Sequence, residues 1–165
     1  MHSIITATIT ELNGVLAHHI DGLSRYAFGY SYGDRPVMDN GEPTPVDTFI
    51  NNGLCHVYAL VVHARLVEMG LTRVSVVGSP THVFLEYEDR FYDAGWPAGS
   101  LDLDDLTQWP KRDLIDYLDA RELYAQFPSV DEARTVLSML VTTPFATAYH
   151  ATTRFLSLNS TGVRQ

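Results

Sequence analysis

The sequence predicts an α+β fold in which helices pack on a small antiparallel sheet. Residues 54–69 carry the apolar stripe of an amphipathic helix, with a glycine directly after the last turn. Three strand-like runs follow at about 73–77, 82–87 and 90–94, and turn residues separate them. Helical patterns precede and follow this region, so the order is helix, loop, helix, antiparallel strands and further helices.

The N-terminal part combines a helix with the longest loop signal in the chain. Residues 8–20 are expected to be helical, because Thr8 and Glu11 have capping-box spacing and apolar residues recur at helical intervals. The aromatic residues within 26–32 alternate, which fits either a short strand or a loop that lines a groove. Glycines and prolines within 33–47 predict a long loop, and such loops are more often functional than idle.

The C-terminal part is predicted to be helical. Three helices are expected, at about 113–126, at 130–141 and at 145–157. The second begins behind a capping box of Ser129 and Glu132, and the third follows Pro144. We expect residues 1–157 to form a single domain and residues 158–165 to be a flexible tail.

Composition and charge argue against several classes of protein. Hydrophobic residues make up 45% of the chain and charged residues 19%, a balance typical of globular domains. The net charge of −9 predicts no nucleic-acid partner. No apolar run reaches the roughly 20 residues of a membrane-spanning helix. The first residues resemble no signal peptide, so we expect a cytoplasmic protein, with a secreted effector as the other possibility.

Cys55 is the single cysteine and cannot form a disulfide within the chain. A cysteine on an apolar helix stripe is usually a core residue. Cys55, however, falls in the first turn of its helix, where free amides and the positive end of the helix dipole favour the reactive thiolate. The same amides can hold an oxyanion. Gly53 would let a substrate backbone approach closely, and the side chain of Asn51 or Asn52 is a candidate further oxyanion donor.

The register of the predicted hairpin brings a histidine and an aspartate together. With a two-residue turn at 88–89, Tyr87 lies opposite Arg90. Asp93 then becomes a diagonal neighbour of His82 on one face, about 5–8 Å apart at Cβ. A neutral imidazole beside a thiol can accept its proton, and a carboxylate behind the ring fixes its tautomer and orientation.

Three segments resemble the core of the transglutaminase-like, papain-type cysteine superfamily. They are Gly53-Leu-Cys-His-Val-Tyr-Ala59, Thr81-His-Val-Phe-Leu-Glu-Tyr87 and Arg90-Phe-Tyr-Asp-Ala94. Members of this superfamily present a cysteine on a helix, then a histidine and an aspartate on adjacent strands. The resemblance implies a papain/transglutaminase-like core with a catalytic triad of Cys55, His82 and Asp93. The segment 92–96 is also similar to the aspartate segment of arylamine N-acetyltransferases, and Trp96 within it is a candidate wall of the site.

These observations predict a cysteine-dependent acyl-transfer enzyme that acts on an amide. A protease, a glutamine deamidase and a transglutaminase-like enzyme all fit, and we expect a protein or peptide substrate. The alternatives are an N-acetyltransferase-like acyl transferase and a catalytically silent binding module on the same fold. No organic cofactor is expected, and the sequence gives no oligomeric state.

Two groups of residues could suggest a metal site, but each has a simpler interpretation. His56 and His63 lie seven residues apart on one helix and could join His82 around zinc, but helical ligand pairs favour a spacing of three or four. The aspartates within 102–105 lack the glycine and the glutamate of a calcium-binding EF-hand loop, and a helix start explains them better. We therefore expect no metal.

Overall fold

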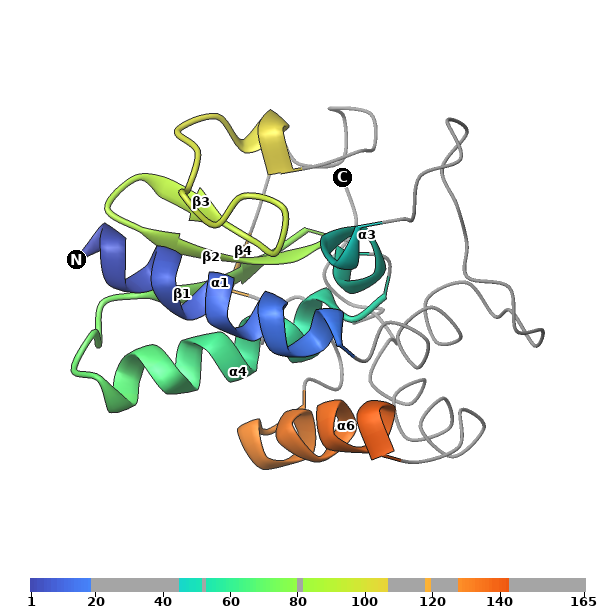
Figure 1. Cartoon of the computed structure of the whole chain (residues 1–165). Coiled ribbons are helices and arrows are strands. Elements are labelled where there is room, and N and C mark those ends of the chain that lie inside the picture. The colour runs from blue at the N-terminus through green and yellow to red at the C-terminus, as the bar shows by residue number, and fades with distance from the viewer. Residues whose placement is uncertain (19–44, 52, 80–81, 107–117, 120–127, 143–165) are drawn as a thin grey trace, which may run out of the picture.

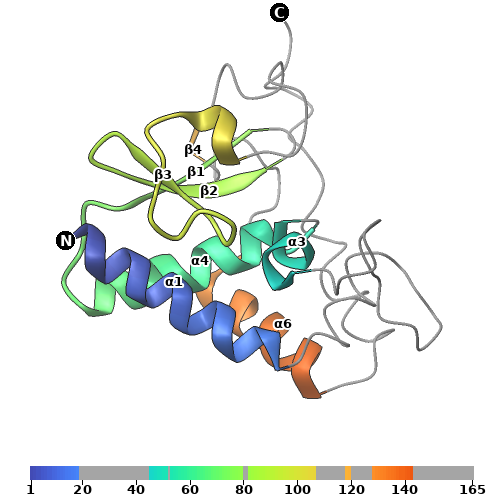
Figure 2. The same cartoon turned by 45° about the horizontal axis from the view of Figure 1, so that its top comes forward.

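The computed structural model describes residues 1–18, 45–51, 53–79, 82–106, 118–119 and 128–142. Within these ranges the protein is an α+β fold, as predicted. Helices α1 (His2–Ala17) and α4 (Cys55–Glu68) cover one face of a four-stranded antiparallel sheet, and α6 (Val130–Thr142) packs on the side of α4 away from the sheet (Figures 1 and 2). The short helix α3 (Val46–Asn51) leads towards the start of α4. No helix among the described residues is long and apolar enough to cross a bilayer.

The sheet has the strand order β3-β2-β1-β4. Its strands are β1 (Ser75–Gly78), β2 (Val83–Tyr87), β3 (Arg90–Tyr92) and β4 (Leu118–Asp119). The last strand contradicts the helix predicted over 113–126. Its two residues pair with Val77 and Gly78 at the open edge of β1, and this long-range pairing overrides the local helical pattern. The rest of 113–126 lies outside the described residues.

The β2–β3 hairpin has the predicted two-residue turn. Glu88 and Asp89 have φ angles of 48° and 61°, the paired left-handed conformation of a type I′ turn. Tyr87 accordingly pairs with Arg90, which confirms the expected register. Both strands are shorter than predicted: β2 begins one residue after His82, and β3 ends at residue 92.

Helix α1 begins six residues earlier than predicted. Thr8 is not a cap, because its hydroxyl donates to the Ile4 carbonyl at 2.9 Å from the middle of the helix. Ile5, Ile9 and Leu16 are buried at helical spacing and hold the extra turns in the core. Burial by distant elements, rather than the local capping pattern, thus sets where this helix begins.

Helix α4 follows the prediction closely. Gly70 has a φ of 90°, the left-handed conformation expected at the C′ position. Residues 54–60 are all buried, so the first half of the helix is enclosed on every side. Helix α3 was not predicted, since its first residues fell at the end of the expected loop. Its two fully buried side chains, Phe49 and Ile50, hold it in the core.

The capping box predicted for α6 is present. The Glu132 amide donates to the Ser129 hydroxyl at 3.3 Å, and the Ser129 amide donates to the Glu132 carboxylate at 2.9 Å. The aspartates near 102–105 also begin a helix, the short 3₁₀ element Leu103–Leu106. The aromatic stretch 26–32, the helix 145–157, the tail 158–165 and residues 33–44 of the loop lie outside the described residues.

Replacing Gly99 with alanine is expected to destabilise the fold by about 2–4 kcal/mol. Gly99 has a φ of 75°, and a Cβ there would lie 2.4 Å from Cε1 of Tyr92. The Tyr92 ring has little freedom to move, since its hydroxyl is hydrogen-bonded to His2. Gly70→Ala is the matched control, because its φ is 90° but nothing lies within 4 Å of the added carbon. If urea unfolding shows that both variants lose the same free energy of unfolding, the clash with Tyr92 is contradicted.

Candidate active site

Cys55 is the first residue of α4 and is 8% exposed. Gly53, two residues earlier, has a φ of 116°, a conformation that side chains with a Cβ rarely adopt. This turn lets the chain enter the helix with Cys55 at its amino end, which is the positive end of the helix dipole. The side chains of His82 and His56 both lower the pKa of the Cys55 thiol.

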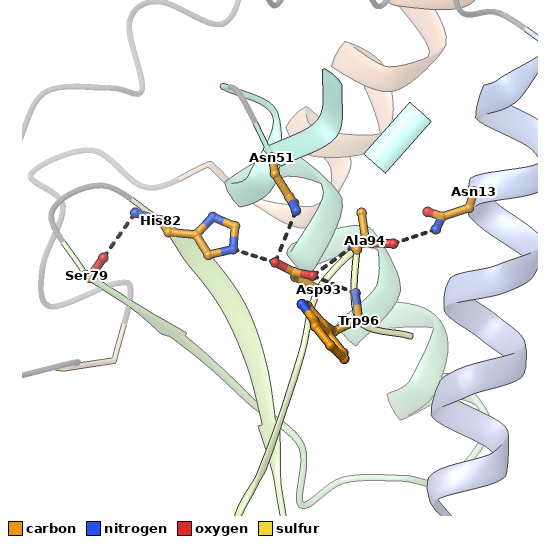
Figure 3. Close-up of polar contacts among 8 residues, drawn as sticks. Asn13, Asn51, Ser79, His82, Asp93, Ala94 and Trp96 are labelled. Carbon is orange, nitrogen blue, oxygen red and sulfur yellow. Dashed lines mark hydrogen bonds and ion pairs between the residues drawn. The ribbon is translucent and has the colours of Figure 1, made fainter. Parts of the chain in front are cut away.

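His82 and Asp93 lie at the same end of the β2–β3 hairpin, one just before β2 and one just after β3. The His82 Nε2 and the Asp93 Oδ2 are 2.9 Å apart, and both side chains are buried (Figure 3). The His82 backbone is anchored as well, since its amide donates to the Ser79 hydroxyl at 3.1 Å. Because Asp93 occupies Nε2, Nδ1 is the ring nitrogen left for Cys55.

The Asp93 carboxylate accepts four hydrogen bonds. Oδ2 accepts from His82 and from the Asn51 side-chain nitrogen at 3.1 Å, and Oδ1 accepts from the amides of Gly95 and Trp96 at 2.8 and 2.9 Å (Figure 3). These donors come from three separate parts of the chain, so the carboxylate is fixed in both position and orientation. A fixed carboxylate can in turn fix the imidazole that it contacts.

The charges in this cluster favour an ion pair. Burial opposes ionisation of the Cys55 thiol, but hydrogen bonding by His56 and His82, together with the charges of both rings, lowers its pKa to about 5. Burial likewise opposes protonation of His82, but hydrogen bonds to Asp93 and Cys55 and the charges of both partners raise its pKa to about 10. Between these values the pair holds a thiolate and an imidazolium.

The other predicted site residues have mixed outcomes. The Asn51 nitrogen donates to Asp93, a contact that the sequence did not predict, and its role as an oxyanion donor stays a prediction. Asn52 lies outside the described residues. Trp96 contributes its backbone amide to Asp93, while 42% of the residue is exposed, so its place as a wall of the site also stays a prediction.

Two hydrogen bonds that the sequence did not predict hold the backbone next to Asp93. The Asn13 side-chain nitrogen donates to the Ala94 carbonyl at 2.8 Å, and the Tyr58 hydroxyl donates to the Asn13 oxygen at 2.6 Å. Tyr58 lies three residues after Cys55, so it shares that face of α4, and this spacing was the available signal. Asn13 gave no signal, because its contact depends on how α1 docks.

The described residues include no group of three histidine, cysteine, aspartate or glutamate side chains that could hold a metal ion. His63 is engaged elsewhere, since its Nε2 lies 3.0 Å from the Val74 carbonyl oxygen. The chain matches no family model, no curated protein and no solved structure. The geometry of the site is therefore the basis for assigning a function.

Proposed function

We propose that this protein is a cysteine-dependent acyl-transfer enzyme that acts on an amide through Cys55, His82 and Asp93. The observation that carries the proposal is that the buried His82 ring is hydrogen-bonded to the Asp93 carboxylate at 2.9 Å and also lowers the pKa of the Cys55 thiol. A nucleophile, an acid–base group and an orienting carboxylate in this order are what acyl transfer requires.

In the first half-reaction the Cys55 thiolate attacks the carbonyl carbon of the amide. The C–S bond forms while the carbonyl π electrons move to oxygen, and the resulting oxyanion is stabilised by amides at the start of α4. The His82 imidazolium then gives its proton to the amide nitrogen, the C–N bond breaks, and the amine leaves. Asp93 keeps the ring oriented throughout.

In the second half-reaction an acceptor attacks the thioester carbon. His82, now neutral, takes the proton of the acceptor, the C–S bond breaks, and its electron pair returns to the Cys55 sulfur. Water as acceptor gives a protease or a deamidase, and an amine gives a transglutaminase or an N-acetyltransferase-like enzyme. The order of cysteine on a helix, histidine and aspartate in the chain supports a papain/transglutaminase-like core, and we propose a protein or peptide substrate.

A catalytically silent binding module is the second candidate. The burial of Cys55, His82 and Asp93, which are 8%, 5% and 4% exposed, favours it, since a purely structural cluster needs no access for substrate. The two candidates differ in the chemistry of the thiol rather than in the fold. A structural cysteine in a buried setting is inert, whereas a nucleophile is ionised at low pH.

We expect the rate at which iodoacetamide alkylates Cys55 to inflect near pH 5, so that the rate at pH 6 is close to its maximum. The matched control is the same chain unfolded in urea, whose thiol should inflect at about 8.5. The position of the inflection, rather than the absolute rate, is the readout, because burial slows the reagent at every pH. If the alkylation rate of the folded protein also inflects at pH 8.5 or above, the proposal of a cysteine-dependent enzyme is rejected.

A thiolate alone does not make an acyl-transfer enzyme, so a second experiment looks for the acyl-enzyme. Wild-type protein is incubated with a panel of activated esters and peptide amides, and intact mass is measured after rapid acid quenching. We expect an adduct whose mass equals that of the acyl group, mapped to Cys55 and missing in Cys55→Ser. If Cys55 is ionised at low pH but no compound of the panel gives an adduct, the binding module is favoured.

A further inference from the structure

Tyr58 is a buried tyrosine of α4 to which the triad assigns no role. It lies three residues after Cys55, so the two side chains share one face of the helix. The residue is 3% exposed, and its hydroxyl donates to the Asn13 side-chain oxygen at 2.6 Å. Burial and the charges of two nearby carboxylates raise the pKa of Tyr58, so the hydroxyl keeps its proton and remains a donor.

Asn13 connects this hydroxyl to the loop that follows β3. Its Nδ2 donates to the Ala94 carbonyl at 2.8 Å (Figure 3). A backbone carbonyl only accepts, so the nitrogen of the amide has to face Ala94 and the oxygen has to face Tyr58. Ala94 directly follows Asp93, and the next two backbone amides donate to the Asp93 carboxylate. The two hydrogen bonds thus form one link, Tyr58–Asn13–Ala94, between α4 and the loop that holds this carboxylate.

Packing alone does not fill the junction that this link spans. Cys55, Tyr58 and Asp93 all border a cavity of about 10 Å³, and apolar side chains of β2 line part of the same cavity. Apolar burial has no preferred direction, so it does not by itself fix how far α4 lies from the loop. Hydrogen bonds have a defined length and direction. The Tyr58–Asn13–Ala94 link therefore fixes this separation where packing leaves a gap.

Acyl transfer depends on the same separation. The thiol comes from α4, whereas the histidine and the aspartate come from the two ends of the β2–β3 hairpin. A base has to lie within hydrogen-bond reach of the group whose proton it takes. A misplacement of about 1 Å can slow a reaction by about 100-fold.

We propose that Tyr58 is a positioning residue that acts through Asn13 and sets the distance between Cys55 and the His82–Asp93 pair. The proposal rests on the proposed function of Cys55. Neither Tyr58 nor Asn13 gives up a proton in the two half-reactions, so the link stays intact while His82 exchanges its own proton. The link holds the loop through the Ala94 carbonyl, and Asp93 transmits the position of the loop to the His82 ring at 2.9 Å.

Three variants test the link through the pH dependence of Cys55 alkylation by iodoacetamide. Tyr58→Phe removes the hydroxyl and keeps the ring in the core, and His82 should then stabilise the thiolate less. We expect the inflection of the alkylation rate to rise by about one pH unit. Asn13→Leu keeps the branched shape but neither donates nor accepts, so it should raise the inflection equally. The double variant should show no larger shift, because both substitutions break the same link.

Tyr87→Phe is the matched control. Tyr87 is a buried tyrosine whose hydroxyl lies 3.2 Å from the Met1 sulfur, and it ends β2 at the opposite end of that strand from His82. Urea unfolding should show that both tyrosine variants are less stable than wild type. Only Tyr58→Phe should also move the inflection. A Tyr58→Phe variant that loses stability but keeps the wild-type inflection has lost a structural contact only, and this result overturns the proposal.

The double variant gives a second way to contradict the proposal. If its shift equals the sum of the two single shifts, Tyr58 and Asn13 act separately and form no link. The proposed function survives either of these results, provided that the wild-type inflection lies near pH 5. A wild-type inflection at 8.5 or above would instead remove the proposed function and the role of the link with it.

A measurement on unaltered protein covers the case in which a variant fails to fold. Proton NMR follows the two side-chain amide protons of Asn13. We expect one of them to exchange slowly with water, because it is donated to the Ala94 carbonyl in the folded protein. If both protons exchange as fast as those of a fully solvated asparagine, the link does not persist in solution and the proposal is overturned.

Discussion

Alanine at position 82 should move the reactivity of Cys55 from acidic to alkaline pH. The substitution removes a hydrogen bond and a positive charge from the thiolate, and only His56 then opposes the effect of burial. Since burial disfavours an ionised thiol, the alkylation rate should inflect above about pH 8 instead of near 5. At pH 6 the rate should fall by at least about 100-fold. This is the largest effect that we expect on the pH dependence of the thiol from a single substitution.

The matched control is His63→Ala, which removes a histidine from the same helix. His63 is hydrogen-bonded to the Val74 carbonyl and belongs to neither the triad nor the surroundings of the sulfur. Its pH profile should coincide with that of wild type. If His82→Ala and wild type were alkylated equally fast at pH 6, the Cys55–His82 pair would have no part in activating the thiol.

Asp93→Ala should cause the largest loss of stability, about 3–5 kcal/mol in urea unfolding. The carboxylate is 4% exposed and accepts four hydrogen bonds, so its removal leaves four donors without this acceptor. One of them, the His82 ring, also loses the charge that supports its protonation. The alkylation inflection of Cys55 should therefore rise as well.

Two further variants separate this explanation from a general sensitivity to acidic residues. Asp131→Ala removes an aspartate whose side chain is 95% exposed, and its cost should be below about 0.5 kcal/mol. Asp93→Asn keeps the shape and one acceptor oxygen, so its loss should fall between the two. An Asp93→Ala variant as stable as Asp131→Ala would mean that the four hydrogen bonds are not a net contribution to stability.

The sequence predicted those parts of the site that depend on local signals. The turn at 88–89 sets the strand register, and this register places His82 and Asp93 at one end of the hairpin. Gly70 marks the end of α4, and the position of Cys55 in its first turn follows from the length of the apolar stripe. In each case a turn or cap residue and neighbours within a few positions determine the local structure.

The features that the sequence failed to predict depend on contacts between distant segments. Strand β4 exists because β1 has an open edge, and α1 extends to His2 because the core covers its first turns. The bond from Asn51 to Asp93 joins residues 42 positions apart, and no pattern near either residue indicates it.

The hairpin that carries His82 and Asp93 has a consequence for how the site assembles during folding. These two residues are 11 positions apart and joined by a tight turn, so closing that loop costs little entropy and is fast. Cys55 lies 27 positions before His82 and reaches it only when α4 docks on the sheet. The pair of His82 and Asp93 can therefore form early in folding, before Cys55 is close to it. The pKa of the Cys55 thiol falls only when α4 has docked on the sheet. Reactivity at low pH is thus a built-in reporter of the completed tertiary fold.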